Sequence, residues 1–270
     1  EPRFIHDSYA SRKGKGTLAA LKRFDSFLRK VTDNGKQVPE SLTANAVCGF
    51  VFKADIRHYF DTVDHAVLLG ILGKRVKDDG VLWLTEIILQ NYHSGMRGRG
   101  MPLGNWTSQF FANVYLNELD QFVKHELGAK YYLRYVDDFV ILERSKTTLQ
   151  GYEKRIKAFL QVLKLNLHPS KCKISPLCRG IGLLGFRKFY HHTLVRQRNI
   201  RKIWKKLTEM LDSYTRYGTD WTEIIDTLEG WNAYAQHANT HHLRARLTHV
   251  IHEDLVRRSD LRKLSRAKKS

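Results

Sequence analysis

The chain has 270 residues, enough for one large or two smaller domains, and its hydrophobic content of 42% excludes a disordered tail. Lysine and arginine number 46 against 27 aspartate and glutamate residues, and the formal net charge of +19 favours a polyanionic partner, most often nucleic acid. No apolar stretch approaches the length of a membrane span, so we expect no membrane association. Three cysteines without a C-x-x-C pair predict reduced thiols in a cytoplasmic protein.

The first 46 residues contain a basic loop followed by a helical pattern. The loop over 12–16 carries two glycines and can approach a phosphate backbone closely, although a solvated basic turn is an equal alternative. Candidate contacts to nucleic acid in it are Arg12, Lys13 and Lys15. A helix is predicted over 17–28, with Thr17 as its N-cap, and the polar segment 30–46 is expected to be a loop.

A buried strand is predicted over 50–56, because five of its seven residues are apolar. Asp55 lies near its end, where a charged side chain is costly unless it is paired or binds a metal. Asp61 and Asp64, a little further on, are interpreted as acids at helix starts rather than as metal ligands.

Two helical patterns flank a flexible loop in the next part of the chain. The segment 81–91 has helical periodicity and is predicted to belong to the core. The glycine-rich segment 93–104 is expected to be a loop whose Arg97 and Arg99 contact a nucleic-acid backbone. A long buried helix is predicted over 107–127. The apolar stripe of this helix comprises Phe111, Val114, Tyr115, Leu119, Phe122 and Val123.

The segment YYLRYVDDFVILE, residues 131–143, predicts a hairpin whose tight turn lies at 136–138. Asp137 and Asp138 repel each other there, which favours a bound divalent cation over the alternative of a solvated turn. If the strand ending near Asp55 lies beside this hairpin, the three acids converge on two metal ions. Two such ions are the standard device for in-line displacement at phosphorus, so the acids predict a nucleotidyl-transfer centre.

Several motifs together resemble the palm of reverse transcriptases. They are the YVDD turn, ADIRHYFDTVDH and MPLGNWTSQFFANVYLNELDQFVKHEL, with SYASRKGKGTLAAL, LNLHPSKCKI and GLLGFRKF in further support. The likeness is closest to the bacterial and phage enzymes of diversity-generating retroelements. Two stretches carry it: the G-N-x-T-S-Q run at 104–109, where intron and retroviral enzymes usually show Q-G-x-x-x-S-P, and GWNAYAQHANTHHLR near the end.

The resemblance implies an α+β right-hand polymerase fold. Residues 1–46 would be the remaining part of the fingers, 47–190 the catalytic palm with an antiparallel sheet and packed helices, and 191–270 a helical, basic thumb. The first fingers motifs are missing, and we expect the chain to be a fragment of a longer protein, encoded by a bacterium or phage.

The resemblance also implies roles at the catalytic centre. Asp55, Asp137 and Asp138 would hold two Mg²⁺ ions, with Mn²⁺ as a substitute, and the carbonyl of Ile56 would contribute to one ion. Lys171 would act near the pyrophosphate as an electrostatic clamp or general acid, with Lys173 as the fallback.

Further residues would bind the incoming nucleotide: His58, Tyr59, Phe60, Leu103, Gly104 and Gln109. Phe60 would exclude a 2′-hydroxyl and so select deoxynucleotides, although burial of its ring in the core is the alternative. Leu103 stands where related enzymes usually carry a glutamine that monitors pairing. An aliphatic residue cannot donate those hydrogen bonds, so we expect low fidelity, concentrated at template adenines.

The remaining nucleic-acid contacts implied by the resemblance are Tyr135, Leu184, Gly185, Phe186, Arg244 and Arg246. Trp231 and Tyr234 are expected to pack internally, with packing against a ribose as the alternative. The expected activity is copying of a structured template RNA into error-rich cDNA from a primer and dNTPs, with an oligomeric basic accessory protein as partner. The alternatives are a reverse transcriptase of the group II intron or phage-defence type, and a non-catalytic RNA-binding scaffold of the same fold.

Overall fold

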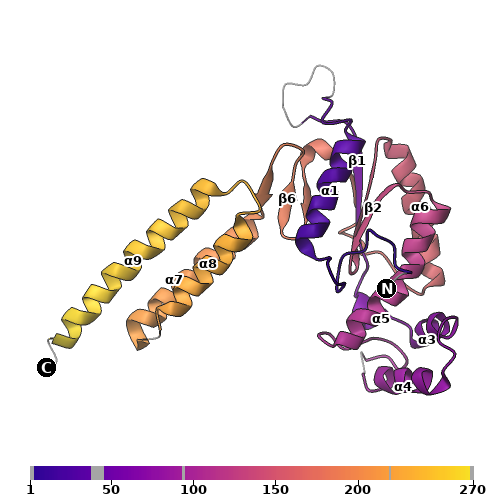
Figure 1. Ribbon diagram of the computed structural model, residues 1–270, viewed down its shortest axis with the longest axis horizontal. Coiled ribbons are helices and arrows are strands. Elements are labelled where there is room, and N and C mark those ends of the chain that lie inside the picture. The colour runs from indigo at the N-terminus through magenta and orange to yellow at the C-terminus, as the bar shows by residue number, and fades with distance from the viewer. Residues whose placement is uncertain (1–2, 38–45, 93–94, 219, 268–270) are drawn as a thin grey trace. The chain divides into compact units, whose positions relative to one another are not determined.

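The computed structural model describes residues 3–37, 46–92, 95–218 and 220–267 (Figure 1). The chain divides into two compact units, Glu1–Arg179 and Gly180–Ser270. Parts of the two expected loops, residues 38–45 and 93–94, lie outside the described residues. In the described part of the chain, no helix is long and apolar enough to cross a membrane.

A four-stranded antiparallel sheet forms the centre of the first unit, in the order β2-β3-β1-β4. Its strands are β1 (Phe50–Asp55), β2 (Tyr131–Tyr135), β3 (Asp138–Glu143) and β4 (Lys173–Pro176). The predicted strand and hairpin are therefore confirmed. The turn is one residue shorter than predicted, because Asp138 already pairs with Tyr135 as the first residue of β3.

Helices cover both faces of this sheet, because side chains on both of its faces are apolar (Figure 1). On one face the ring of Tyr131 contacts Phe27 of α1 (Thr17–Val31), with ring centroids 5.5 Å apart. On the other, Tyr132 points toward α5 (Trp106–Gln121), and α6 (Lys146–Val162) packs on the central strands. The sheet is thus the middle layer of three.

The helix α1 begins where predicted and runs to Val31, but Thr17 is not its N-cap. Gly16 holds that position with φ of 119°, a conformation that favours glycine, and Thr17 is the first helical residue. The hydroxyl of Thr17 instead lies 3.2 Å from the hydroxyl of Tyr135. The side chain that was expected to cap the helix therefore ties it to the hairpin.

Two short helices follow β1: α2 (Tyr59–Thr62) and α3 (His65–Gly73). Asp64 caps α3 by accepting a hydrogen bond of 3.1 Å from the amide of Val67, which confirms it as an acid at a helix start. Asp61 lies in the first turn of α2, also as predicted. The carboxylate of Asp64 additionally pairs with Lys164 at 2.7 Å.

The helix α4 (Asp79–Gln90) is present, but only one side of it belongs to the core, so that prediction is confirmed in part. Its large apolar side chains Val81, Trp83, Leu84 and Ile87 are exposed, Trp83 to 63%. The reason is its position at the edge of the unit, where it packs mainly on α3 and buries only one side, through Thr85 and Leu89. Periodicity indicates the helix but not the number of neighbours that cover it.

The long helix predicted over 107–127 is confirmed as α5, extended by one π-helical segment, η1 (Phe122–Glu126). Its predicted stripe is buried, with Val114 half-buried. The rings of Phe122 and Phe159 of α6 stack at 4.2 Å, so α5 and α6 share one core.

The second unit begins with the meander β5 (Ile181–Leu183), β6 (Phe186–Lys188) and β7 (Thr193–Val195), preceded in the first unit by the 3₁₀ turn η2 (Leu177–Arg179). Three helices follow: α7 (Gln197–Tyr217), α8 (Thr222–Ala235) and α9 (His241–Ala267). Trp231 is buried and the ring of Tyr234 packs on Phe186 at 4.8 Å, which confirms the expected internal packing of both.

A fully buried ion pair connects the layers of the first unit. Arg134 of β2 donates to both carboxylate oxygens of Asp120 on α5, at 2.7 and 2.6 Å, and Tyr132 donates to the same carboxylate at 2.7 Å. Both charged side chains are inaccessible to solvent. A buried charge is tolerated only while it is paired and hydrogen-bonded, so each partner depends on the other.

We therefore expect Asp120→Asn to destabilise the first unit by about 3 kcal/mol, because it leaves Arg134 buried without a counter-charge. Urea unfolding followed by circular dichroism measures the change. Glu153→Gln is the matched control, since it removes one acid from the surface pair with Lys157 on α6 and should cost less than about 1 kcal/mol. Equal effects of the two substitutions would contradict the role given to the buried pair.

Candidate active site

The sheet brings the three predicted acids to one end. Asp55 is the last residue of β1 and lies directly opposite Asp138, the first residue of β3. Asp137 occupies the hairpin turn after Val136, whose φ of 54° lies in the left-handed region. The amide of Ile56 donates to the carbonyl of Asp137 at 3.3 Å, which fixes the turn against the end of β1.

The segment 166–172 holds Asp55 from the other side. The amide of His168 donates to the carbonyl of Asp55 at 2.7 Å, and the amide of Asp55 donates to the sulfur of Cys172 at 3.4 Å. The ammonium of Lys171 contacts both carboxylate oxygens of Asp55, at 3.0 and 3.2 Å. The predicted lysine therefore lies at the acids, whereas the fallback Lys173 is exposed on β4 opposite Lys53.

Burial and mutual repulsion govern the charges of this cluster. Burial raises the pKa of Asp137, and the nearby charges of Asp55 and Asp138 raise it further. Burial also raises the pKa of Asp138, partly offset by Lys53, whose ammonium lies 3.8 Å away. The hydrogen bond to Asp55 raises the pKa of Lys171. The site thus concentrates negative charge that cations stabilise.

The donor set fits hard divalent cations in its chemistry, since it consists of carboxylate oxygens. Within the described ranges, however, no group of three or more His, Cys, Asp or Glu side chains is gathered closely enough to hold a metal ion as the side chains stand. At Asp55 the ammonium of Lys171 already occupies the position of a cation. A metal ion bound there would displace or share this contact.

Beneath the turn lies Arg134, which the sequence interpretation missed. Its guanidinium donates to the carbonyl of Val136 at 2.9 Å, to Asn113 at 3.2 Å and to Ser8 at 3.2 Å, besides pairing with Asp120. A signal was present in the sequence. Strand alternation places Arg134 on the same face as Tyr132, toward the core, and a charge there requires a buried partner.

The predicted nucleotide-binding residues differ in exposure. Tyr59 is buried and donates from its hydroxyl to the carbonyl of Ala112 at 2.9 Å, while Phe60 is half-buried against it. His58 is exposed, with φ of 46° at the start of α2. Leu103 is 71% exposed, and Gly104 beside it has φ of 92°.

Gln109, the last residue of the predicted nucleotide-binding set, accepts a hydrogen bond of 2.8 Å from the hydroxyl of Ser11. This contact links the first turns of α5 to the basic loop at 12–16. None of the roles expected for the nucleotide-binding set is tested by these positions, so they remain predictions.

Two of the three basic residues in the loop 12–16 already have partners. Arg12 donates to the carbonyls of Ile5 and Ser8, at 2.7 and 2.9 Å. Lys15 donates to the carbonyl of His6 at 2.9 Å. These side chains hold the N-terminal segment, and Lys13 is exposed.

The other predicted contacts of the first unit lie in two places. Arg97 is exposed, and Arg99 forms an isolated β-bridge with Asp64. Tyr135 is half-buried beside Thr17, at the end of β2 next to the turn.

The remaining predicted contacts belong to the second unit. Leu184 and Gly185 form the turn between β5 and β6, with φ of 46° and 91°. A side chain at Gly185 would force Tyr234 to shift, because a Cβ atom would lie 2.6 Å from the hydroxyl oxygen of Tyr234. On α9, Arg246 is exposed and Arg244 is half-buried.

An antiparallel sheet with acids at a hairpin turn, packed against long helices, defines a right-hand polymerase-like fold. Solved telomerase structures share it. Telomerase from Candida tropicalis matches with a TM-score of 0.53 at 13% identity, over 93% of this chain and 51% of that one. Telomerase from Candida albicans, in complex with a TWJ fragment of telomeric RNA, matches with 0.53 at 10% identity, over 93% and 49%.

The chain belongs to the reverse transcriptase (RNA-dependent DNA polymerase) family, whose model matches residues 2–188. Protein YkfC of Escherichia coli is 26% identical over 189 residues, covering 56% of this chain. The group II intron-encoded protein LtrA of Lactococcus lactis is 33% identical over 79 residues, covering 26% of this chain and 13% of LtrA. The chain spans about half the length of YkfC, with 48% covered.

The crowding of the acids predicts a stability effect at Asp137. Because its folded-state pKa lies above the ordinary value of 3.8, ionisation of Asp137 opposes folding. Without metal, Asp137→Asn should therefore raise the free energy of unfolding. The gain should be absent below pH 3.8 and complete once the pH exceeds the folded-state pKa.

Urea unfolding in a chelator at several pH values measures this effect. Asp61→Asn is the control, because Asp61 is exposed and outside the cluster. A pH-independent loss of stability in Asp137→Asn would show that the carboxylate is not strained by burial and by its neighbours.

Proposed function

We propose that the protein is an RNA-directed DNA polymerase that extends a primer on a structured RNA template with dNTPs. The observation that carries this proposal is the meeting of Asp55, Asp137 and Asp138 at one end of the sheet, with Lys171 on Asp55. Membership of the reverse transcriptase family supports it. Three acids placed close together lower the stability of a fold. Metal-dependent nucleotidyl transfer is a function that requires such a cluster.

Asp55, Asp137 and Asp138, with the carbonyl of Ile56, would hold two Mg²⁺ ions or Mn²⁺ in their place. Bound divalent ions at such a centre activate a hydroxyl and stabilise the leaving pyrophosphate. The chain's own residues supply the rest. Lys171 carries a compact positive charge suited to the phosphates of the incoming nucleotide, and its contact with Asp55 keeps it at the centre until substrate arrives.

Lys171 is also placed to act as general acid toward the pyrophosphate. Its ammonium carries the proton to be donated, but the hydrogen bond to Asp55 raises its pKa, so donation would require that bond to be released when the pyrophosphate is bound. Arg134 donates a hydrogen bond to the carbonyl of Val136. This contact would fix the turn and so the orientation of the Asp137 side chain. Residues 1–46 would be the remaining fingers, 47–190 the palm and 191–270 the thumb, so the proposed palm takes in β5 and β6 of the second unit.

We further propose the diversity-generating subtype, with error-prone copying at template adenines. Leu103 supports this, because the side chain is exposed at 71% in the expected nucleotide-binding loop and offers no hydrogen bond to a base pair. The G-N-x-T-S-Q run at 104–109 supports it as well. In this proposal the protein works in the cytoplasm of a bacterium, with an oligomeric basic accessory protein.

A group II intron type of reverse transcriptase is the second candidate, favoured by the likeness to LtrA. The two candidates share the chemistry and differ in fidelity, so the error spectrum separates them. A non-catalytic RNA-binding scaffold is the candidate from another class, and the intact acids weigh against it.

Primer extension on an RNA template with Mg²⁺ and four dNTPs tests the chemistry. Asp138→Ala should reduce extension by at least about a thousandfold, because it removes a charge that no other residue replaces. Glu153→Gln on the surface of α6 should leave extension unchanged. Extension by Asp138→Ala at the rate of the unmodified protein would refute the assigned centre.

Sequencing of the extended products tests the subtype. Leu103→Gln should lower misincorporation opposite adenine by about tenfold, because a glutamine restores polar contacts that a wrong pair leaves unpaired. Leu18→Gln, at another exposed leucine, on α1, is the matched control and should not change the spectrum. Identical error spectra for the Leu103 variant and the unmodified chain would argue for a faithful, intron-like enzyme.

A further inference from the structure

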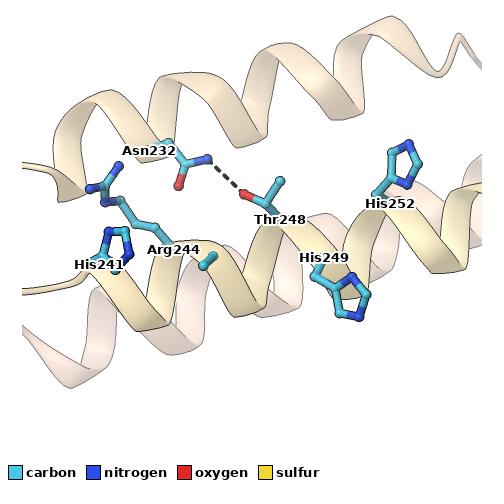
Figure 2. A pocket seen from close by; sticks show the side chains of 7 residues that line it. Asn232, His241, Arg244, Thr248, His249 and His252 are labelled. Atoms are coloured by element: carbon cyan, nitrogen blue, oxygen red, sulfur yellow. Dashed lines mark hydrogen bonds between the residues drawn. The ribbon is translucent and has the colours of Figure 1, made fainter.

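Positive side chains outnumber acids in this protein, at 46 lysine and arginine residues against 27 aspartate and glutamate residues. The pocket between α8 and α9 illustrates the excess (Figure 2), since its seven lining residues include Arg244 and three histidines but no acid. Lys53 is in the opposite situation. It lies in the sheet of the first unit next to the clustered acids, and it has no part in the proposed reaction. A lysine at that place affects every cation that the acids attract.

The strand register brings Lys53 to the acids. Residues two apart on a strand project from the same face, so Lys53 shares a face with Asp55, the last residue of β1. Asp55 lies directly opposite Asp138, and the ammonium of Lys53 lies 3.8 Å from a carboxylate oxygen of Asp138. On the other side of β1, Lys53 lies directly opposite Lys173 of β4. Like charges that face each other across a sheet are unfavourable, so the contact with Asp138 favours a lysine here.

The two lysines at the acids are held differently. Lys171 contacts Asp55 at 3.0 and 3.2 Å, and its side chain is 55% exposed, so it can turn toward solvent when another group takes its place. The side chain of Lys53 is only 22% exposed. Its contact of 3.8 Å with Asp138 is longer than a hydrogen bond, so Lys53 acts on that carboxylate through its charge. Lys53 therefore keeps a positive charge at the acids when Lys171 leaves.

This remaining charge has a consequence for metal binding. With Lys171 displaced from Asp55, Lys53 still offsets one carboxylate of the cluster and repels each cation that enters it. Repulsion between charges at such a short distance changes an affinity several-fold even in water. Lys53 thus opposes occupancy of a centre whose carboxylate oxygens attract hard divalent cations.

We propose that Lys53 is a fixed counter-charge that lowers the affinity of the acid cluster for divalent ions and so sets the metal concentration at which the centre fills. This inference rests on the proposed function in one respect, that the three acids bind divalent metal ions. It goes further by giving a residue outside the ligand set control over the occupancy of those ligands. Lys53 acts on the reaction only through the acids.

Titration of the full chain with Mn²⁺, followed by electron paramagnetic resonance, tests the inference without any catalytic step. Lys53→Met keeps most of the aliphatic stem and removes the charge. It should raise the affinity for Mn²⁺ by about fivefold, the effect of one unit charge about 4 Å away in water. Lys53→Gln repeats the loss of charge with a polar side chain, so that an effect of the methionine on folding cannot decide the result.

Two further variants serve as controls. Lys53→Arg keeps the charge and should leave the affinity for Mn²⁺ within about twofold of that of the unmodified chain. Lys173→Met removes the same charge from the neighbouring strand, further from Asp138, and should also change the affinity by less than about twofold. In primer extension, the Mg²⁺ concentration that gives half of the maximal rate should fall by about fivefold in Lys53→Met and stay unchanged in Lys173→Met.

The direction of the change separates this inference from a merely structural role. If Lys53 only supported Asp138, its removal would loosen that carboxylate and weaken the binding of Mn²⁺. Weaker or unchanged affinity in folded Lys53→Met and Lys53→Gln would therefore overturn the inference and leave the proposed function standing. A failure of the unmodified chain and of every variant to bind Mn²⁺ would overturn both this inference and the proposed metal centre.

Discussion

The buried pair of Arg134 and Asp120 is the interaction on which the first unit depends. One guanidinium joins β2 to α5, reaches the N-terminal segment through Ser8, and holds the carbonyl of Val136 in the hairpin turn. Removing Asp120 would leave a charge in a site without solvent. The same contacts that stabilise the core therefore also set the backbone that presents the acids, so that folding and the geometry of the site cannot be separated.

The clustered acids lower the stability of the fold that positions them. Burial and mutual repulsion raise the pKa of Asp137 and of Asp138, and Lys53 and Lys171 offset only part of the cost. Functional sites commonly carry such strain, which the surrounding structure must outweigh. Here the surrounding structure is the three-layer core, together with main-chain bonds from Ile56 and His168 that fix the strand ends.

Alternation and apolar runs were sufficient to predict β1, the hairpin and the helix over 107–127, because local pattern decides such elements. The convergence of Asp55 with Asp138 also followed, since the strand ending in Asp55 had only to pair beside the hairpin. The sequence pattern could not show which distant residues pack against each element. The exposed apolar side of α4, the carbonyl contacts of Arg12 and Lys15, and the partner of Arg134 all depend on segments distant in the sequence. Because of its charge, Arg12 was expected to contact nucleic acid, whereas its guanidinium donates to the carbonyls of Ile5 and Ser8.

Binding of Mn²⁺ to the double variant Arg134→Met/Asp120→Leu measures whether the buried pair positions the acids for metal binding. Removing both charges leaves no unpaired ion, so the core should stay folded while the turn loses its support. A Mn²⁺ titration followed by electron paramagnetic resonance measures the affinity of the acids for the metal in the variant and in the unmodified chain. This measurement involves no catalytic step. We expect a folded variant whose affinity for Mn²⁺ falls by at least about tenfold. Unchanged affinity in a folded variant would contradict the claim that this buried pair organises the site.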